Sequence, residues 1–142
     1  MVVLDASVAL SWCFEDESDS YSQAVLEHAV KTSFVVPSIW SLEVANGLLV
    51  AERRGRITRA ASAQFVGLLS DLAITVEPEP SLRYEADLMD LARRHNLSAY
   101  DASYLRVSLK KGAALATKDA RLANVALDEG VASWQPPADG NH

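Results

Sequence analysis

Short apolar runs alternate along this chain with longer segments of helical periodicity, and this alternation limits the fold more than any other feature. The runs MVVLD, SFVVP, AITVEP and AALAT have the length and composition of buried strands, and VASW is a candidate fifth strand. Between them, apolar residues recur with the helical period of about 3.6 residues. These helical segments are residues 7–14, 20–31, 38–54, 58–72, 81–95, 98–111 and 119–128. Strands that alternate with helices predict an α/β fold, in which helices cover both faces of a mostly parallel sheet.

Residues with known terminal preferences mark the ends of these helices. Gly55 and Gly112 each follow two cationic residues, as expected for a left-handed residue after the last helical turn. Thr58 and Ser81 are expected to cap the helices that follow them. We find no internal repeat and no linker. The sequence therefore predicts one domain over residues 1–134 and a loose tail over residues 135–142.

Composition excludes several classes of protein. The 142 residues are 49% hydrophobic and 23% charged, as in globular rather than disordered chains. No apolar stretch is long enough to span a bilayer, and the first residues lack the pattern of a signal peptide. The single cysteine, Cys13, excludes an internal disulfide and a cysteine-based zinc cage. A reducing cytoplasm is the expected location.

The net charge of −6 argues against binding of nucleic acid through bulk electrostatic attraction. It leaves room for a local basic rim, although cations at helix ends and on solvated faces are the commoner arrangement. The candidates for such a rim are Arg53, Arg54, Arg56, Arg59, Arg93, Arg94, Lys110, Lys111, Lys118 and Arg121.

Four carboxylates, Asp5, Glu43, Asp101 and Asp119, lie beside apolar runs, where a charge is costly to place. Acids that gather at one point repel one another unless a cation neutralises them, and oxygen-rich sites of this kind suit Mg²⁺ or Mn²⁺. Such a site favours hydrolysis of phosphodiesters, because a divalent ion acidifies water and neutralises charge on the phosphate. We therefore expect these four side chains to form a divalent-metal site.

Asp5 and Asp119 give the strongest geometric reason for this convergence. Asp5 ends the first predicted strand, and Asp119 follows the strand AALAT. If these parallel strands are neighbours, both acids lie at the carboxyl edge, where open parallel sheets bind ligands. Each also has a structural alternative. Asp5 would serve as a turn or cap residue, and Asp119 as a first-turn acid in a helix capped by Thr117.

Glu43 and Asp101 belong to predicted helices and have structural alternatives too. Glu43 shares a helix face with Asn46, three residues on, and we expect this acid and amide to face inward together. The alternative is a solvated glutamate on an exposed face. Asp101 fits a capping box with Ser98, a pattern that needs no function. The residues alone leave these alternatives open.

The segments around the four acids carry a family likeness. VVLDASV, VPSIWSLEVAN, LSAYDASYL and LATKDARL, in this order and at this spacing, resemble the motifs of PIN domains, and specifically of VapC-like toxin ribonucleases from bacterial type II toxin–antitoxin pairs. The likeness covers nearly the whole chain apart from its C-terminal tail. It implies a three-layer α/β/α fold around a parallel sheet of about five strands in the order 3-2-1-4-5.

The resemblance also implies a site and an activity. In the family, acids matching Asp5, Glu43, Asp101 and Asp119 bind Mg²⁺ or Mn²⁺ and carry an endoribonuclease reaction that leaves a 5′-phosphate and a 3′-hydroxyl. A small antitoxin neutralises the family's toxins, and homodimers are common among them. The supporting residues that the resemblance implies are Ser7, Asn46 and Thr117.

Two other functions agree with part of the sequence. A catalytically inactive PIN-like module would keep the fold and bind a partner without cleaving RNA. An aspartate-based phosphohydrolase would also begin with a strand that ends in Asp5, but such enzymes usually carry a second aspartate where this chain has Ser7. Lys118 and Asp119 match only part of the later motif of those enzymes.

Overall fold

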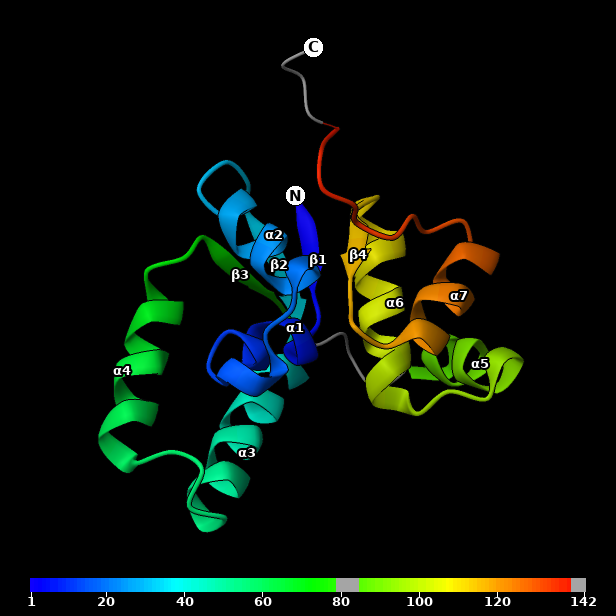
Figure 1. Cartoon of the computed structure of the whole chain (residues 1–142). Helices are drawn as coiled ribbons and strands as arrows, with labels where there is room; N and C mark the ends of the chain where they lie inside the picture. The colour runs from blue at the N-terminus through cyan, green and yellow to red at the C-terminus, as the bar shows by residue number, and fades with distance from the viewer. Residues whose placement is uncertain (79–84, 139–142) are drawn as a thin grey trace.

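A four-stranded parallel sheet forms the centre of the computed structural model, which describes residues 1–78 and 85–138 (Figure 1). The strands are β1 (Val2–Leu4), β2 (Phe34–Pro37), β3 (Ile74–Glu77) and β4 (Ala114–Ala116), and their order across the sheet is β3-β2-β1-β4. In the register of β1 with β4, Leu4 lies opposite Ala116. The carboxyl ends of β1 and β4 therefore meet at one edge, as the sequence predicted.

Helices cover both faces of this sheet, which confirms the predicted three-layer α/β/α class. In Figure 1 helices α1 to α4 lie on one side of the sheet and α5 to α7 on the other, as right-handed crossovers between these strands require. Their bounds are α1 (Ala6–Ser11), α2 (Ser20–His28), α3 (Ile39–Arg53), α4 (Arg59–Ser70), α5 (Glu85–His95), α6 (Ala99–Lys111) and α7 (Ala120–Asp128), with a 3-10 turn η1 (Glu15–Glu17).

The predicted fifth strand is reduced to a single bridge. Ser133 pairs in parallel with Leu115 of β4, on the side of β4 away from β1, which is the place that the order 3-2-1-4-5 assigns to it. Only two backbone hydrogen bonds support this contact, from Leu115 N–H to the Ala132 carbonyl and from Trp134 N–H to the Leu115 carbonyl. Two consecutive prolines follow at 136 and 137, and proline has no N–H with which to extend a ladder.

The first helix is shorter than predicted, because a tertiary contact redirects the chain. Helix α1 ends at Ser11 rather than continuing to residue 14. The indole Nε1 of Trp12 donates to the carbonyl oxygen of Ser22, at 2.8 Å, and so ties this turn to α2. Phe14 follows in an extended conformation and is buried. A local periodicity cannot report such a distant partner.

Most predicted helix ends are found where they were expected. Gly55 and Gly112 have φ angles of 71° and 61°, in the left-handed region that favours glycine. The Thr58 hydroxyl accepts a hydrogen bond from the Ala61 N–H and caps α4. The predicted cap Ser81 lies outside the described residues, as does the predicted tail from residue 139 onward.

The core surrounds β1, which lies between β2 and β4 and is buried on both faces. Val3 and Leu4 are fully buried, as are Leu115 and Leu122. Helix α6 packs across β1, β2 and β4. None of the described helices is long and apolar enough to cross a membrane. The residue after Leu4 is thus held at a rigid position in the centre of the molecule.

Candidate acidic active site

Asp5 occupies the end of β1, and its carboxylate is fixed by two hydroxyl groups. The side chain is nearly buried, and its Oδ2 accepts hydrogen bonds from Thr117 Oγ1 at 2.6 Å and Ser7 Oγ at 2.9 Å. Although Asp5 precedes α1, its side chain makes no capping hydrogen bond to that helix. The cap alternative for Asp5 is therefore not realised, and both hydroxyls implied by the resemblance contact this carboxylate.

Glu43 is half-buried in the second turn of α3, and Tyr104 holds it. The Tyr104 hydroxyl donates to Glu43 Oε1 at 2.6 Å. Burial raises the pKa of Glu43, the Tyr104 hydrogen bond acts in the opposite direction, and the nearby charges of Asp5 and Asp101 raise it further. Asn46, which was expected to share a helix face with Glu43, is exposed, and its supporting role stays a prediction.

Asp101 lies in the first turn of α6 and faces the other acids. Its backbone N–H donates to Ser98 Oγ at 3.0 Å, so the predicted cap is present. Burial raises the pKa of Asp101, and the charges of Asp119 and Asp5 raise it further against the smaller opposing effects of Ser98 and Arg121. Because α6 runs antiparallel to the strands, its first turn reaches their carboxyl edge. The segment that caps α6 therefore also places Asp101 at this edge.

Asp119 is itself the N-cap of α7, so the alternative in which Thr117 caps this helix is not realised. Asp119 Oδ1 accepts from the N–H groups of Arg121 and Leu122, at 3.0 and 3.2 Å. Thr117 precedes the cap: its hydroxyl accepts from the Asp119 N–H at 3.0 Å and donates to Asp5. Thr117 lies two positions before this cap, and its hydroxyl donates to the buried carboxylate of Asp5 instead of capping the helix.

The four acids thus influence one another electrostatically at one edge of the sheet. In the described part of the chain, none of them forms an ion pair with lysine, arginine or histidine. No three acidic, histidine or cysteine side chains within the described ranges stand close enough together to enclose a metal ion directly. The oxygen-only donor set and its negative charge, which no ion pair neutralises in the described part of the chain, fit a hard divalent cation that keeps part of its water shell, as Mg²⁺ usually does.

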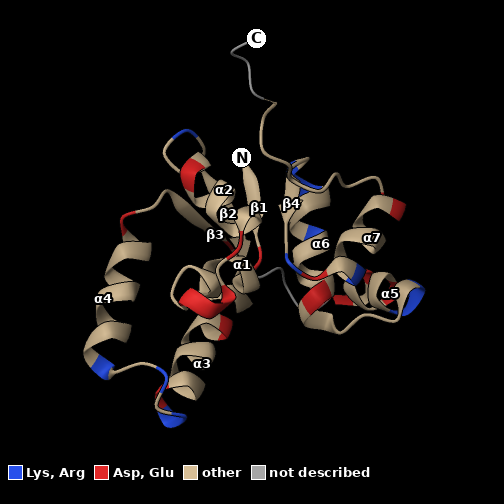
Figure 2. Cartoon of the chain, viewed as in Figure 1, with Lys and Arg blue, Asp and Glu red and all other residues tan. Residues whose placement is uncertain are grey.

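Most candidates for a basic rim are instead paired within the protein. Lys118 forms an ion pair with Asp19 at 3.4 Å, and the Arg121 guanidinium donates to backbone carbonyls at the end of α5. The exception is the tip between α3 and α4, where Figure 2 shows basic residues, although Arg56 of this tip pairs with Asp16 of η1. Three exposed arginines of this tip form no ion pair in the described part of the chain: Arg53, Arg54 and Arg59.

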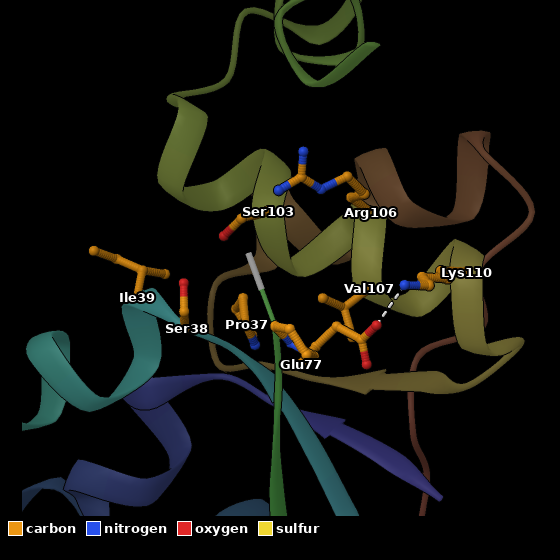
Figure 3. A pocket seen from close by; sticks show the side chains of 9 residues that line it. Pro37, Ser38, Ile39, Glu77, Ser103, Arg106, Val107 and Lys110 are labelled. Carbon is orange, nitrogen blue, oxygen red and sulfur yellow. Dashed lines mark hydrogen bonds and ion pairs between the residues drawn. The ribbon is translucent and has the colours of Figure 1, made fainter. Parts of the chain in front are cut away.

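A pocket of about 250 Å³ with both apolar and charged lining residues lies between α6, the start of α3 and the end of β3 (Figure 3). Its cations also have partners. Lys110 Nζ contacts Glu77 Oε1 at 2.5 Å, and Arg106 pairs with Glu85 at 3.1 Å. These ion pairs attach β3 and α5 to α6. None of the four acids lines this pocket.

Tyr104 is the site residue that sequence reasoning missed. It is completely buried, and its hydroxyl contacts both Glu43 and the backbone N–H of Ala6, the residue after Asp5. The available signal was its position, one turn after Asp101 on the same helix. That signal is weak, because a tyrosine in an apolar helix is ordinarily part of the core.

The fold and the site together define a class of α/β/α proteins whose acidic centre lies at the carboxyl ends of parallel strands. A family model described as the PIN domain matches residues 2–127, and the chain belongs to this family.

Curated relatives agree with this assignment. VapC ribonuclease Mb0985 of Mycobacterium bovis and ribonuclease VapC9 of Mycobacterium tuberculosis are each 32% identical to this chain over 124 residues, which cover 87% of the chain and 90% of the relative.

Solved structures show the same fold. PAE2754 from Pyrobaculum aerophilum superimposes with a TM-score of 0.67 at 24% identity, covering 87% of this chain and 83% of that one. FitAcB from Neisseria gonorrhoeae has a TM-score of 0.56 at 18% identity, covering 96% and 98%.

Proposed function

We propose that this protein is a Mg²⁺- or Mn²⁺-dependent endoribonuclease that acts as the toxin of a toxin–antitoxin pair. The observation that carries the proposal is the gathering of Asp5, Glu43, Asp101 and Asp119 at one sheet edge, with no ion pair to any of them in the described part of the chain. Membership of the PIN family and relatives named as VapC ribonucleases support an RNA substrate.

In this proposal each of the four acids has a role in binding the ion or positioning water. Asp5, held by Ser7 and Thr117, would bind the ion together with Asp101 and Asp119, directly or through water. Glu43 joins them as a ligand or orients the attacking water. The ion, when bound, supplies neutralisation of the phosphodiester charge and a more acidic water. In-line attack would leave a 5′-phosphate and a 3′-hydroxyl on the RNA.

The raised pKa values of Glu43 and Asp101 support this assignment. Carboxyl groups that repel each other in a partly buried cluster are a recurring property of catalytic acid sites. Single-stranded or looped RNA suits such a site, because a splayed phosphate reaches a recessed carboxylate more easily than a phosphate in a duplex. Local cations are few, so the ion itself offsets part of the net charge of −6.

A small antitoxin and a second copy of the chain are the proposed protein partners, and the cytoplasm is the proposed location. An apolar groove of about 340 Å³ between α3, α4 and β3 supports an apolar partner. Exposed Leu42 and Leu49 extend the apolar surface of α3 near this groove. Size-exclusion chromatography with light scattering, with and without a co-expressed antitoxin, distinguishes the two occupants by mass.

The test of the proposed function is cleavage of RNA by wild type and by Asp5→Asn. We expect cleavage to require Mg²⁺ or Mn²⁺, to stop in excess EDTA, and to fall at least about a hundredfold in Asp5→Asn while the protein stays folded. Asp128→Asn is the matched control, because Asp128 is exposed and forms no ion pair in the described structure. Full activity of Asp5→Asn, or activity in EDTA, would contradict the proposal.

The same preparations decide between the alternatives. Binding of Mn²⁺ in calorimetry without cleavage of any RNA would favour a non-catalytic PIN module. A phosphorylated Asp5 trapped from a phosphate ester would favour a phosphohydrolase. The structure gives the latter no support, since Ser7 donates to Asp5 where such an enzyme carries a second acid.

A further inference from the structure

Tyr104 places a phenol hydroxyl at the meeting point of three elements that each carry an acid. Its side chain belongs to α6, one turn after Asp101, and is fully buried. The hydroxyl donates to Glu43 Oε1 on α3 at 2.6 Å and accepts from the N–H of Ala6 at 3.3 Å. Ala6 follows Asp5 directly. A single oxygen thus connects the three segments that hold Asp101, Glu43 and Asp5.

The directions of these two hydrogen bonds are determined by chemistry. A backbone N–H only donates, so the contact with Ala6 uses a lone pair of the Tyr104 oxygen. The hydroxyl proton is then left for Glu43, and a hydrogen bond from a neutral donor to a carboxylate is shorter and stronger than one between neutral groups. The Ala6 contact therefore orients the donor that holds Glu43.

A purely structural role for Tyr104 would need fewer hydrogen-bond partners than the two that its hydroxyl has. A buried tyrosine requires one hydrogen-bond partner, and the Ala6 N–H of the first turn of α1 provides one. The second partner, Glu43, is a half-buried carboxylate without an ion pair in the described residues, and desolvating such a charge is costly. The fold thus holds a costly charge in one orientation instead of leaving it in solvent.

We infer that Tyr104 is a positioning residue of the acidic centre, which fixes the Glu43 carboxylate through Oε1 and leaves Oε2 for the divalent ion or its waters. The inference rests on the proposed function. Groups that orient the groups around a metal typically contribute about 10-fold to 100-fold to metal affinity or activity. Tyr104→Phe removes the donor and keeps the ring that fills the core.

The experiment titrates Mn²⁺ alone into wild type, Tyr104→Phe and Ser11→Ala by calorimetry. Ser11→Ala is the matched control, because it also removes a buried hydroxyl hydrogen bond, from Ser11 to the Val8 carbonyl at 2.6 Å, but touches none of the acids. We expect the dissociation constant for Mn²⁺ to rise about tenfold in Tyr104→Phe and to stay unchanged in Ser11→Ala. Wild-type affinity in Tyr104→Phe, or equal weakening in both variants, would overturn the inference.

A double-mutant cycle identifies the residue through which Tyr104 acts. Single-turnover cleavage of RNA at saturating Mn²⁺ is compared for Tyr104→Phe, Glu43→Gln and the double variant. We expect the double variant to be no slower than Glu43→Gln, because the two residues form one unit. Additive losses would show an effect through Ala6 and Asp5 instead and would refute the assignment. If the wild-type protein neither bound Mn²⁺ nor cleaved RNA, both the proposed function and the inference that rests on it would be refuted.

Discussion

Thr117 connects the Asp5 carboxylate to the backbone N–H of Asp119 with one hydroxyl group. It is buried, donates to Asp5 at 2.6 Å and accepts from the Asp119 N–H at 3.0 Å. At the residue scale, the centre is therefore a set of acids held by neutral donors: Thr117 and Ser7 for Asp5, and Tyr104 for Glu43. Neutral donors orient a carboxylate without cancelling the charge that an ion would need.

Thr117→Val tests this arrangement with little change in side-chain shape. The variant removes the donor to Asp5 and leaves the Asp119 N–H without its acceptor, so we expect a loss of about 1–3 kcal/mol in the free energy of unfolding. Cleavage of RNA should fall as well. Urea denaturation and a cleavage assay measure the two effects.

Thr75→Val is the control for Thr117→Val, because Thr75 is exposed on β3. The same substitution there should leave stability and cleavage close to wild type. If Thr117→Val behaved like Thr75→Val in both assays, the hydroxyl of Thr117 would have no part in the site.

At the scale of single elements, helix ends decide where the acids lie. Helices α1, α6 and α7 all begin at the carboxyl edge of the sheet, and the caps of α6 and α7 use Ser98 and Asp119. A cap role and the proposed metal-binding role are compatible for Asp119. Its Oδ1 caps α7, and Oδ2 would be the oxygen that binds the proposed ion. The caps Thr58 and Ser98 were predicted from the sequence because they depend on only a few neighbouring residues.

Two glycine substitutions are expected to change stability in opposite directions. Gly112 ends α6 with φ of 61°, so Gly112→Ala should lower the free energy of unfolding by about 1 kcal/mol through backbone strain. Gly67 lies inside α4 with open space around its Cα, so Gly67→Ala should raise stability by up to about 1 kcal/mol. Chemical denaturation of both variants checks this, and equal signs would contradict the assigned helix end.

At the scale of the whole molecule, the cluster of four acids destabilises the fold through its charge. Burial first, and then the other acids, raise the pKa values of Glu43 and Asp101 in the folded protein. Between the unfolded values, near about 4, and these raised values, the folded state binds more protons than the unfolded state. Without metal, these two groups therefore reduce stability progressively as the pH rises through that window.

Asp101→Asn should accordingly be more stable than wild type in EDTA at neutral pH. The difference in melting temperature should shrink as the pH falls toward 4, where the wild-type carboxyl becomes protonated. Mg²⁺ or Mn²⁺ should raise the melting temperature of wild type more than that of the variant. Thermal scans at both pH values, with Asp128→Asn as the control, measure this. A variant less stable than wild type at neutral pH would contradict the charge argument.

The sequence by itself determined the alternation of strands and helices, most helix ends and the identity of the four acids. These features depend on short-range patterns: burial of consecutive strand residues, helical periodicity and caps within three or four positions. The placement of Asp5 and Asp119 at one edge of the sheet could also be inferred, once β1 and β4 were taken as neighbours.

Only the tertiary structure decided which groups hydrogen-bond to those acids and which basic side chains are left without an ion pair in the described residues. The link from Tyr104 to Glu43, the exposure of Asn46, the early end of α1 and the pairing of Lys118 with Asp19 all depend on contacts between distant segments. Residues 43 and 104 are brought together because α3 and α6, on opposite faces of the sheet, both begin at its carboxyl edge. No local sequence pattern predicts the contact between Glu43 and Tyr104, because it depends on packing that forms only when the sheet is complete.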